Sequence, residues 1–349
     1  MKKTGLTCIV FFLVFSFWIS NAIGVTTLTY SDHDPPSGLR VDSVKIWIEL
    51  IEKESNGRIK VKPLFGGAMG SASEALKLVG SGSVDMAFVF PDFYPKQLLC
   101  LNIFKLFPQG PGKWDNIYHV YDQIFKTIPE FSKELEKENQ KLVYVTSSLP
   151  AAMCATYPVN SIDDLKGKKW RASSRWHLMY LKAVGATPVS VPWVDCYMSL
   201  QTGVINGVLT DYDGMHDTKL DEAAPNIFIN PKVWFGSPFM HTININTWKK
   251  LTKEDQDAIL RASQKVSKGI FGPMFEKEYT VVMEAQKKSG AKIVIWKDED
   301  LQKWNNNPAI KEAREIWIKE AKEAGIKEPE KIMESVGKII HEATLKEKN

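Results

Sequence analysis

Residues Ser161 to Thr210 decide the fold, and they read SIDDLKGKKWRASSRWHLMYLKAVGATPVSVPWVDCYMSLQTGVINGVLT. Ser161 and Asp164 have the spacing of a capping box, and Gly167 ends the turn that this box opens. Apolar periodicity and turn residues then predict strands that alternate with helices, the strands at 168–172, 187–191 and 204–210, the helices from near 175 and at 194–201. Such alternation is typical of an α/β fold with parallel strands.

Arg171 stands at the end of the first of these strands. Open α/β sheets bind their ligands at the carboxyl ends of strands, and a guanidinium group matches a carboxylate through two parallel hydrogen bonds. Trp193 opens the helix at 194–201, and Thr210 ends the third strand, so we expect both near Arg171. Helix N-termini at the same edge also favour an anion. The sequence therefore predicts a carboxylate-binding site centred on Arg171.

The strand–helix rhythm also runs through the rest of the chain. Before this stretch, the pattern predicts strands at 25–30, 58–64, 84–90 and 141–147 and helices at 39–55, about 73–79 and about 114–140. After it, the pattern predicts a strand at 240–246, then mostly helix with one strand near 292–296. The character changes near residues 148 and 236. We therefore predict two lobes, lobe I comprising 25–148 plus 236–275 and lobe II comprising 149–235 plus 276–349.

The N-terminal residues 1–24 are typical of a secretory signal peptide. Lys2 and Lys3 precede an almost wholly apolar run, and small residues follow at cleavage spacing. The run is short for a membrane span, which leaves a retained anchor as the weaker alternative. Removing the two lysines lowers the formal net charge from +4 to +2. Such a nearly neutral chain lacks the basic footprint of a nucleic-acid-binding protein, and we expect an exported one.

Sequence patterns of enzyme active sites are missing. The chain contains no GxSxG, GxxxxGK[ST] or HExxH. The glycine-rich loop at 65–70 lacks a lysine and is a weak phosphate cradle. Two carboxylate pairs, Asp32/Asp34 and Asp211/Asp213, lie on turn-like segments, where such groups are more often solvated or capping than catalytic. We therefore expect a binding protein rather than an enzyme.

Cysteine and histidine spacing gives no metal-site signature. Cys100, Cys154 and Cys196 remain after export, and this odd, sparse count excludes a disulfide framework but leaves one bond open. The six histidines are scattered, and no CxxC or HxxxH pair occurs. We expect neither a metal nor a cofactor.

Segments along the whole mature chain fit one family pattern: NGRIKV at 56–61, GGAMG at 66–70, GSVDMA at 82–87, LKGKKWR at 165–171, GATPV at 185–189 and LQTGVING at 200–207. In order and spacing they resemble the DctP-type substrate-binding proteins of tripartite ATP-independent periplasmic (TRAP) transporters. The resemblance implies a two-lobed, type II-like periplasmic binding fold. It also implies that Arg171 fixes the ligand carboxylate and that a membrane permease, driven by an ion gradient, receives the ligand.

Two departures from the family pattern narrow the range of possible ligands. Members often have asparagine where Thr210 stands, and sialic-acid binders have a second arginine near position 151, which is Ala151 here. Strand-end logic adds further candidate pocket residues, namely His33, Phe90, Asp211, Tyr212, Trp234 and Phe235. Several aromatic residues around one arginine predict a monocarboxylate with an apolar or aromatic body. His33 and Asp211 would then hydrogen-bond a hydroxyl, keto or amino group.

The sequence thus predicts a periplasmic solute receptor, monomeric, that delivers a small organic acid to TRAP permease subunits. Two other classes stay open: a sensory ligand binder that docks with a receptor, and, less favoured, an enzyme on the same scaffold. The sequence does not name the ligand or decide whether it carries an amino or hydroxyl group.

Overall fold

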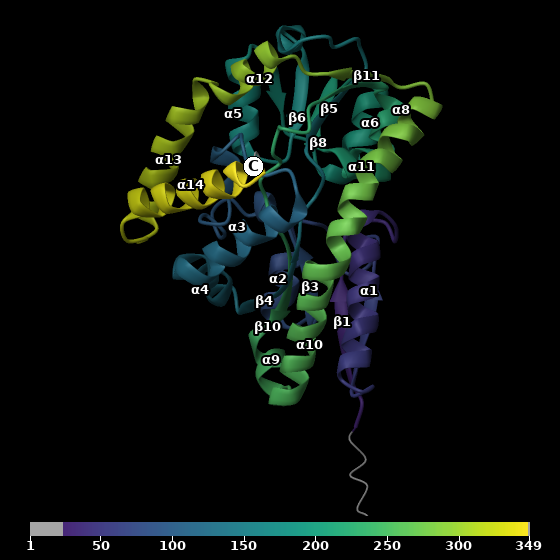
Figure 1. The fold of residues 1–349 in the computed structure, drawn as a ribbon, viewed down its shortest axis with the longest axis vertical. Helices are drawn as coiled ribbons and strands as arrows, with labels where there is room; N and C mark the ends of the chain where they lie inside the picture. The colour runs from purple at the N-terminus through teal and green to yellow at the C-terminus, as the bar shows by residue number, and fades with distance from the viewer. Residues whose placement is uncertain (1–23, 348–349) are drawn as a thin grey trace, which may run out of the picture.

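A computed structural model describes residues 24–347 and shows two lobes, each built on one β-sheet (Figure 1). The predicted signal peptide at 1–24 lies outside the described residues except for Gly24. Lobe I is the lower body of Figure 1 and lobe II the upper one. The predicted α/β fold with two lobes is therefore confirmed.

Lobe I has a five-stranded sheet of order β2-β1-β3-β10-β4. Its strands are β1 (Thr26–Ser31), β2 (Ile59–Leu64), β3 (Met86–Val89), β4 (Gln140–Thr146) and β10 (Phe239–Asn244). The first three pair in parallel, as the βαβ rhythm predicts, while β10 is antiparallel to both neighbours. The helices of this lobe include α1 (Leu39–Glu54), α2 (Ala75–Ser81), α9 (Ile245–Lys250) and α10 (Lys253–Lys265). Helices α3 (Trp114–Thr127) and α4 (Pro129–Lys137) also belong to it.

Lobe II has a six-stranded sheet of order β11-β9-β5-β8-β6-β7. Its strands are β5 (Ala151–Ala155), β6 (Lys169–Ala172), β7 (Thr187–Val189), β8 (Gly207–Asp211), β9 (Asn226–Ile229) and β11 (Lys292–Ile295). Its helices include α5 (Arg175–Ala183), α6 (Cys196–Gln201), α7 (Tyr212–Asp217), α8 (Leu220–Ala223) and α12 (Asp298–Asn305). The Ser161–Asp164 capping box is present, and Ser174 caps α5 by accepting the Trp176 N–H. These local signals place Arg171 at the end of β6.

The chain crosses between the lobes twice within its strand regions and again along helices. The strand crossings lie between β4 and β5 and between β9 and β10. The long helix α11 (Phe271–Lys288) packs on α1 of lobe I and on α7 of lobe II. At the C-terminus, α13 (Ala309–Glu323) packs on α5, and α14 (Pro329–Leu345) packs on lobe I, so these helices brace both lobes. The boundaries predicted near 148 and 236 fall in or beside the strand crossings, while that at 275 falls inside α11; the division itself stays a prediction.

Three local predictions were wrong or incomplete. The single helix expected at about 114–140 is two helices, α3 (Trp114–Thr127) and α4 (Pro129–Lys137). Pro129 has no N–H to donate and pushes Ile128 out of the helical region, to φ −121° and ψ 94°. Strands β5 and β9 were not predicted, because each is short and neither follows the βαβ rhythm.

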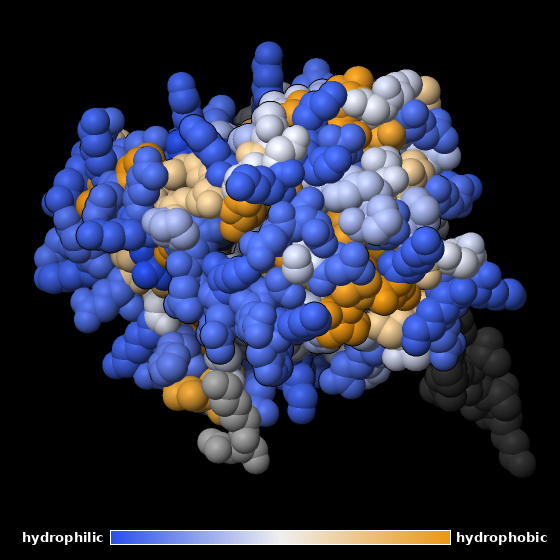
Figure 2. Space-filling view, turned by 90° about the horizontal axis from the view of Figure 1, so that it is seen from above, coloured by the Kyte–Doolittle hydropathy of each residue, from blue (hydrophilic) through white to orange (hydrophobic). Residues whose placement is uncertain are grey.

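The surface of lobe II seen from above is mostly hydrophilic, with scattered apolar groups (Figure 2). In residues 24–347, large apolar side chains that are exposed include Met69, Val194, Met198 and Val204. Within the same range, no helix combines the length and the apolar character that crossing a bilayer requires.

Gly207 in β8 is a packing requirement of lobe II. It lies opposite Trp170 of β6, a fully buried residue whose indole N–H donates to the Tyr157 hydroxyl at 3.1 Å. A Cβ at Gly207 would come within 2.6 Å of the Trp170 ring. The glycine therefore leaves the space that the indole fills.

We predict that Gly207→Ala lowers the free energy of unfolding by about 1–3 kcal/mol, because the buried ring has to shift. Urea denaturation followed by tryptophan fluorescence measures the change. Gly269→Ala is the matched control, since its Cβ would meet no atom within 4 Å. Equal unfolding midpoints for the two variants would contradict the packing argument.

Candidate ligand-binding site

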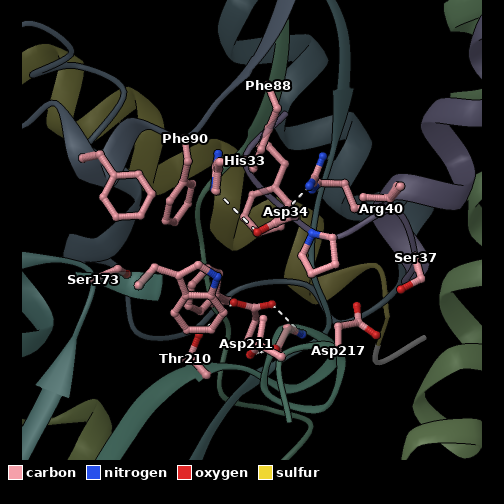
Figure 3. Close-up of a pocket in the computed structure, with 18 of the residues that line it drawn as sticks. His33, Asp34, Ser37, Arg40, Phe88, Phe90, Ser173, Thr210, Asp211 and Asp217 are labelled. Carbon is pink, nitrogen blue, oxygen red and sulfur yellow. Dashed lines mark hydrogen bonds and ion pairs between the residues drawn. The ribbon is translucent and has the colours of Figure 1, made fainter. Parts of the chain in front are cut away.

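A pocket lies in the cleft between the two lobes (Figure 3). Its cavity has a volume of about 60 Å³, which is room for a few water molecules. Of the residues predicted from the sequence, it brings together Arg171, Trp193, Thr210, Phe90, His33, Asp211 and Phe235. Further lining residues come from lobe I, namely Asp34, Ser37, Arg40, Phe88, Phe93 and Phe239, and from lobe II, namely Ser173, Gly214, Asp217 and Thr218.

Arg171 is buried and has no acidic partner among residues 24–347. Its side chain comes from the end of β6, and the residue is 2% exposed. Its Nε donates to the carbonyl oxygen of Val191 at 3.1 Å, while its buried Nη1 has no hydrogen-bond partner among residues 24–347. Burial lowers the pKa of Arg171, because a guanidinium charge is poorly solvated in the interior. An anion placed beside it would relieve that penalty.

Trp193 and Thr210 flank Arg171. The centre of the Trp193 ring lies 5.3 Å from the guanidinium carbon, which is within cation–π range. The Thr210 hydroxyl donates to Asp211 Oδ1 at 3.0 Å. That hydroxyl proton is thus already engaged within the protein.

Arg40 is a second buried guanidinium in the pocket wall, and its charge is neutralised. It makes two bonds to Asp32, of 2.6 and 2.9 Å, and one to Asp34 of 2.6 Å. These two acids raise the pKa of Arg40 although burial alone would lower it. Asp32 and Asp34 are therefore ion-pair partners, not the solvated or capping groups that their turn-like segment suggested.

Aromatic rings form one wall of the pocket. Phe90 meets Phe93 and Phe239 edge-on and stacks parallel to Phe235 with ring centres 6.1 Å apart. His33 stacks on Phe88 at 5.1 Å. The His33 side chain is 6% exposed, and its Nδ1 has no partner among the described residues. This wall offers apolar contact with one unused polar atom.

Asp211 joins β8 to α7 and caps that helix. It accepts the Gly214 N–H at 2.9 Å as well as the Thr210 hydroxyl. Burial raises the pKa of Asp211, and Asp34 adds to the rise, while the two donors oppose it. The capping role considered for this acid pair therefore holds for Asp211. Asp213 instead accepts the Leu149 N–H and so ties α7 to the segment before β5.

The two lobes contact each other around the pocket. Asp92, which follows β3 in lobe I, accepts the Ser173 hydroxyl of lobe II at 2.8 Å and the Ser237 hydroxyl at 2.9 Å. Lys105 Nζ lies 3.6 Å from Asp92 and 3.2 Å from the centre of the Phe235 ring. Burial lowers the pKa of Lys105 to about 8, against the opposing effect of Asp92. Through Ser173, which follows Arg171 by two residues, this network joins the two lobes beside the pocket.

Tyr212 and Trp234 do not line this pocket. The Tyr212 hydroxyl donates to Gln286 at 2.7 Å inside lobe II. The Trp234 ring packs edge-on against Phe104 with centres 6.3 Å apart, and over Gly110. Their positions beside pocket residues in sequence did not reveal that their side chains point the other way.

Sequence reasoning missed Arg40, Ser173 and Asp217 as pocket residues. Ser173 lies in the turn before the helix that starts near 175, and neither it nor Asp217 carried a motif. For Arg40, the one signal was its place in the first turn of α1, directly after the Asp32–Asp34 segment. Cys100, Cys154 and Cys196 are buried free thiols, and within residues 24–347 no three His, Cys, Asp or Glu side chains gather where they could hold a metal.

Comparisons with solved structures show the fold. A TRAP solute-binding protein from Rhodoferax ferrireducens, in complex with benzoate, is 18% identical with a TM-score of 0.82, covering 92% of this chain and 99% of that one. A marine metagenome TRAP protein specific for aromatic acids, in complex with 3-hydroxybenzoate, is 21% identical with a TM-score of 0.80 and the same coverage. A third, from Chromohalobacter salexigens, holds D-glucuronate; it is 18% identical with a TM-score of 0.77, covering 89% and 99%.

The sequence also matches a known family over most of its length. The model of DctP, bacterial extracellular solute-binding protein, family 7, matches residues 30–320. This match confirms the resemblance seen in the motifs from 56–61 to 200–207. The chain belongs to the DctP family of bacterial extracellular solute-binding proteins, the periplasmic solute receptors of TRAP transporters.

Proposed function

We propose that this receptor binds a small monocarboxylate with an aromatic or apolar body in the cleft between its lobes. The observation that carries the proposal is Arg171, a buried guanidinium with no acidic partner in residues 24–347. A ligand carboxylate would accept two parallel hydrogen bonds from it, in a site where exclusion of water strengthens the attraction. Trp193 then covers the ion pair from one side.

The number of available cations argues against a dicarboxylate. Arg40 is held by Asp32 and Asp34, and Lys105 lies behind the Phe235 ring, near Asp92. Among the described lining residues, this leaves Arg171 to receive one carboxylate. A second would have to lie near the aspartates of the pocket, which repel it.

The aromatic wall and the small cavity argue for a compact ring or chain. Phe88, Phe90, Phe93 and Phe239 offer apolar surface, and burial of a ligand ring against it contributes about 25 cal/mol per Å². Similar solved structures that hold benzoate and 3-hydroxybenzoate are in keeping with such a ligand. The ligand is then delivered to the membrane permease of a TRAP transporter, which recognises the closed form.

We infer further that the receptor is exported by cleavage of residues 1–24 and acts as a monomer that turns over no substrate. Its task is reversible closure. The ligand would stabilise the closed form by adding its own contacts to the Asp92–Ser173 hydrogen bond between the lobes.

We predict that Arg171→Lys weakens binding of benzoate or a substituted benzoate by about 100-fold. The charge remains, but the paired hydrogen bonds to a planar carboxylate are lost. Isothermal titration calorimetry measures the dissociation constants. Arg175→Lys makes the same change four residues away, outside the pocket lining, where Arg175 pairs with Glu320. Equal affinity of the Arg171→Lys variant and the wild type would refute the carboxylate anchor.

We also predict that Ser173→Ala weakens ligand binding about 5- to 10-fold, mainly through faster dissociation. The variant loses a hydrogen bond to a charged group that joins the lobes. Stopped-flow fluorescence gives the dissociation rate. In Ser148→Ala, the control, the hydroxyl removed is buried and has no partner in the described residues, so the rate should not change. If both variants dissociate at the wild-type rate, the contact has no part in closure.

A further inference from the structure

Asp217 lies at the end of the pocket that is remote from Ser173. It is the last residue of α7 in lobe II, yet it reaches lobe I, because a Cβ at Gly38 would come within 2.0 Å of its Oδ2. Figure 3 shows Asp217 beside Ser37, with Ser173 and Thr210 at the opposite side of the cavity. Arg171 belongs to that opposite side, two residues before Ser173. Asp217 therefore lies where the two lobes meet at this end of the pocket.

Asp217 differs from the other carboxylates of the lining in having no donor. Asp34 is bonded to Arg40, and Asp211 accepts the Thr210 hydroxyl and the Gly214 N–H. For Asp217, no hydrogen bond or ion pair connects either oxygen to a residue in 24–347. The oxygens of Asp217 are only partly buried, so they stay open to a donor from a bound molecule.

The charges around Asp217 are mostly negative, which also favours a donor at this end of the pocket. Burial raises its pKa to about 7, Glu278, Asp211 and Asp34 add to the rise, and His216 opposes it. Once the proposed ligand carboxylate neutralises Arg171, no cation of the lining is left for this end of the pocket. A second carboxylate there would meet several acids, whereas a donor would meet an open acceptor.

Two buried polar atoms in the same lining lack partners among residues 24–347. They are Nη1 of Arg171, on a residue 2% exposed, and Nδ1 of His33, on a side chain 6% exposed. A bound molecule with polar groups at both ends would satisfy atoms that the protein itself leaves unpaired. The acidic end is therefore part of a site that is already built for a ligand.

We propose that the ligand carries a hydrogen-bond donor, a hydroxyl or a protonated amine, at the end remote from its carboxylate, and that Asp217 accepts this donor. Asp217 is then a specificity-determining residue, and acids without a donor bind more weakly. The inference rests on the proposed function, since it takes the Arg171–carboxylate pair as the other end.

The test uses the mature chain and three kinds of probe: benzoate, the 3- and 4-hydroxybenzoates, and the 3- and 4-(aminomethyl)benzoates. Calorimetry at pH 8, above the pKa of Asp217, gives the affinity of the wild type and of Asp217→Asn for each. We expect at least one donor-bearing acid to bind the wild type about 10- to 100-fold tighter than benzoate. Asp217→Asn should remove that preference, because the donor loses its charged acceptor.

The hydroxyl and amine probes separate the two kinds of donor. Asp257→Asn, the matched control, removes an exposed carboxylate on α10 that pairs with Lys253, and it should keep the preference. A preference that survives Asp217→Asn, or a wild type that binds benzoate at least as well as every donor-bearing acid, would overturn this inference alone. Two results would overturn the proposed function and this inference with it. In one, the wild type binds none of the probes; in the other, the Arg171→Lys variant binds them as tightly as the wild type does. Thermal unfolding of each variant confirms that it is folded.

Discussion

The buried charge of Arg171 is the constraint on which the site depends. A guanidinium group loses its hydration in the interior, and an acidic partner normally compensates for that loss. Here the described protein offers only the Val191 carbonyl oxygen and the face of Trp193. Both of these are fixed by the short strands and turns that precede α6. The fold of lobe II therefore holds a cation in a position where an incoming anion is stabilised.

Closure of the cleft is linked to that cation through chain connectivity. Ser173 lies two residues beyond Arg171 and bonds to Asp92 of lobe I, so moving lobe II moves the anchor and the contact together. Burial disfavours the charge of Asp34, but His33, Arg40 and, to a lesser extent, the Trp193 indole lower its pKa. A ligand on Arg171 would join contacts that already span both lobes.

The sequence predicted those parts of the site that depend on local signals. The capping box at Ser161 and the cap at Ser174 set where β6 and α5 begin and end, and these limits place Arg171 at a strand end. Features that depend on distant partners were not predictable. Ser173 bonds to Asp92, 81 residues away, and Tyr212 bonds to Gln286, 74 residues away. Trp234 and Phe235 are adjacent, yet only one faces the pocket, because side-chain direction follows from the path of the crossing segment.

Two arginines in one pocket show why unpaired charge, rather than charge, defines a binding site. Arg40 is buried like Arg171, but its guanidinium group is already bonded to two aspartates. It therefore holds the loop after β1 against α1 and does not anchor a ligand. Arg171 keeps one donor that no residue in the described part of the chain satisfies. The same reasoning separates Asp217 from Asp34 and Asp211, which already have donors. A pocket with one unpaired cation and one unpaired acid at opposite ends selects molecules by the distance between their own acid and donor groups, so its specificity resides in that spacing as much as in the aromatic wall between.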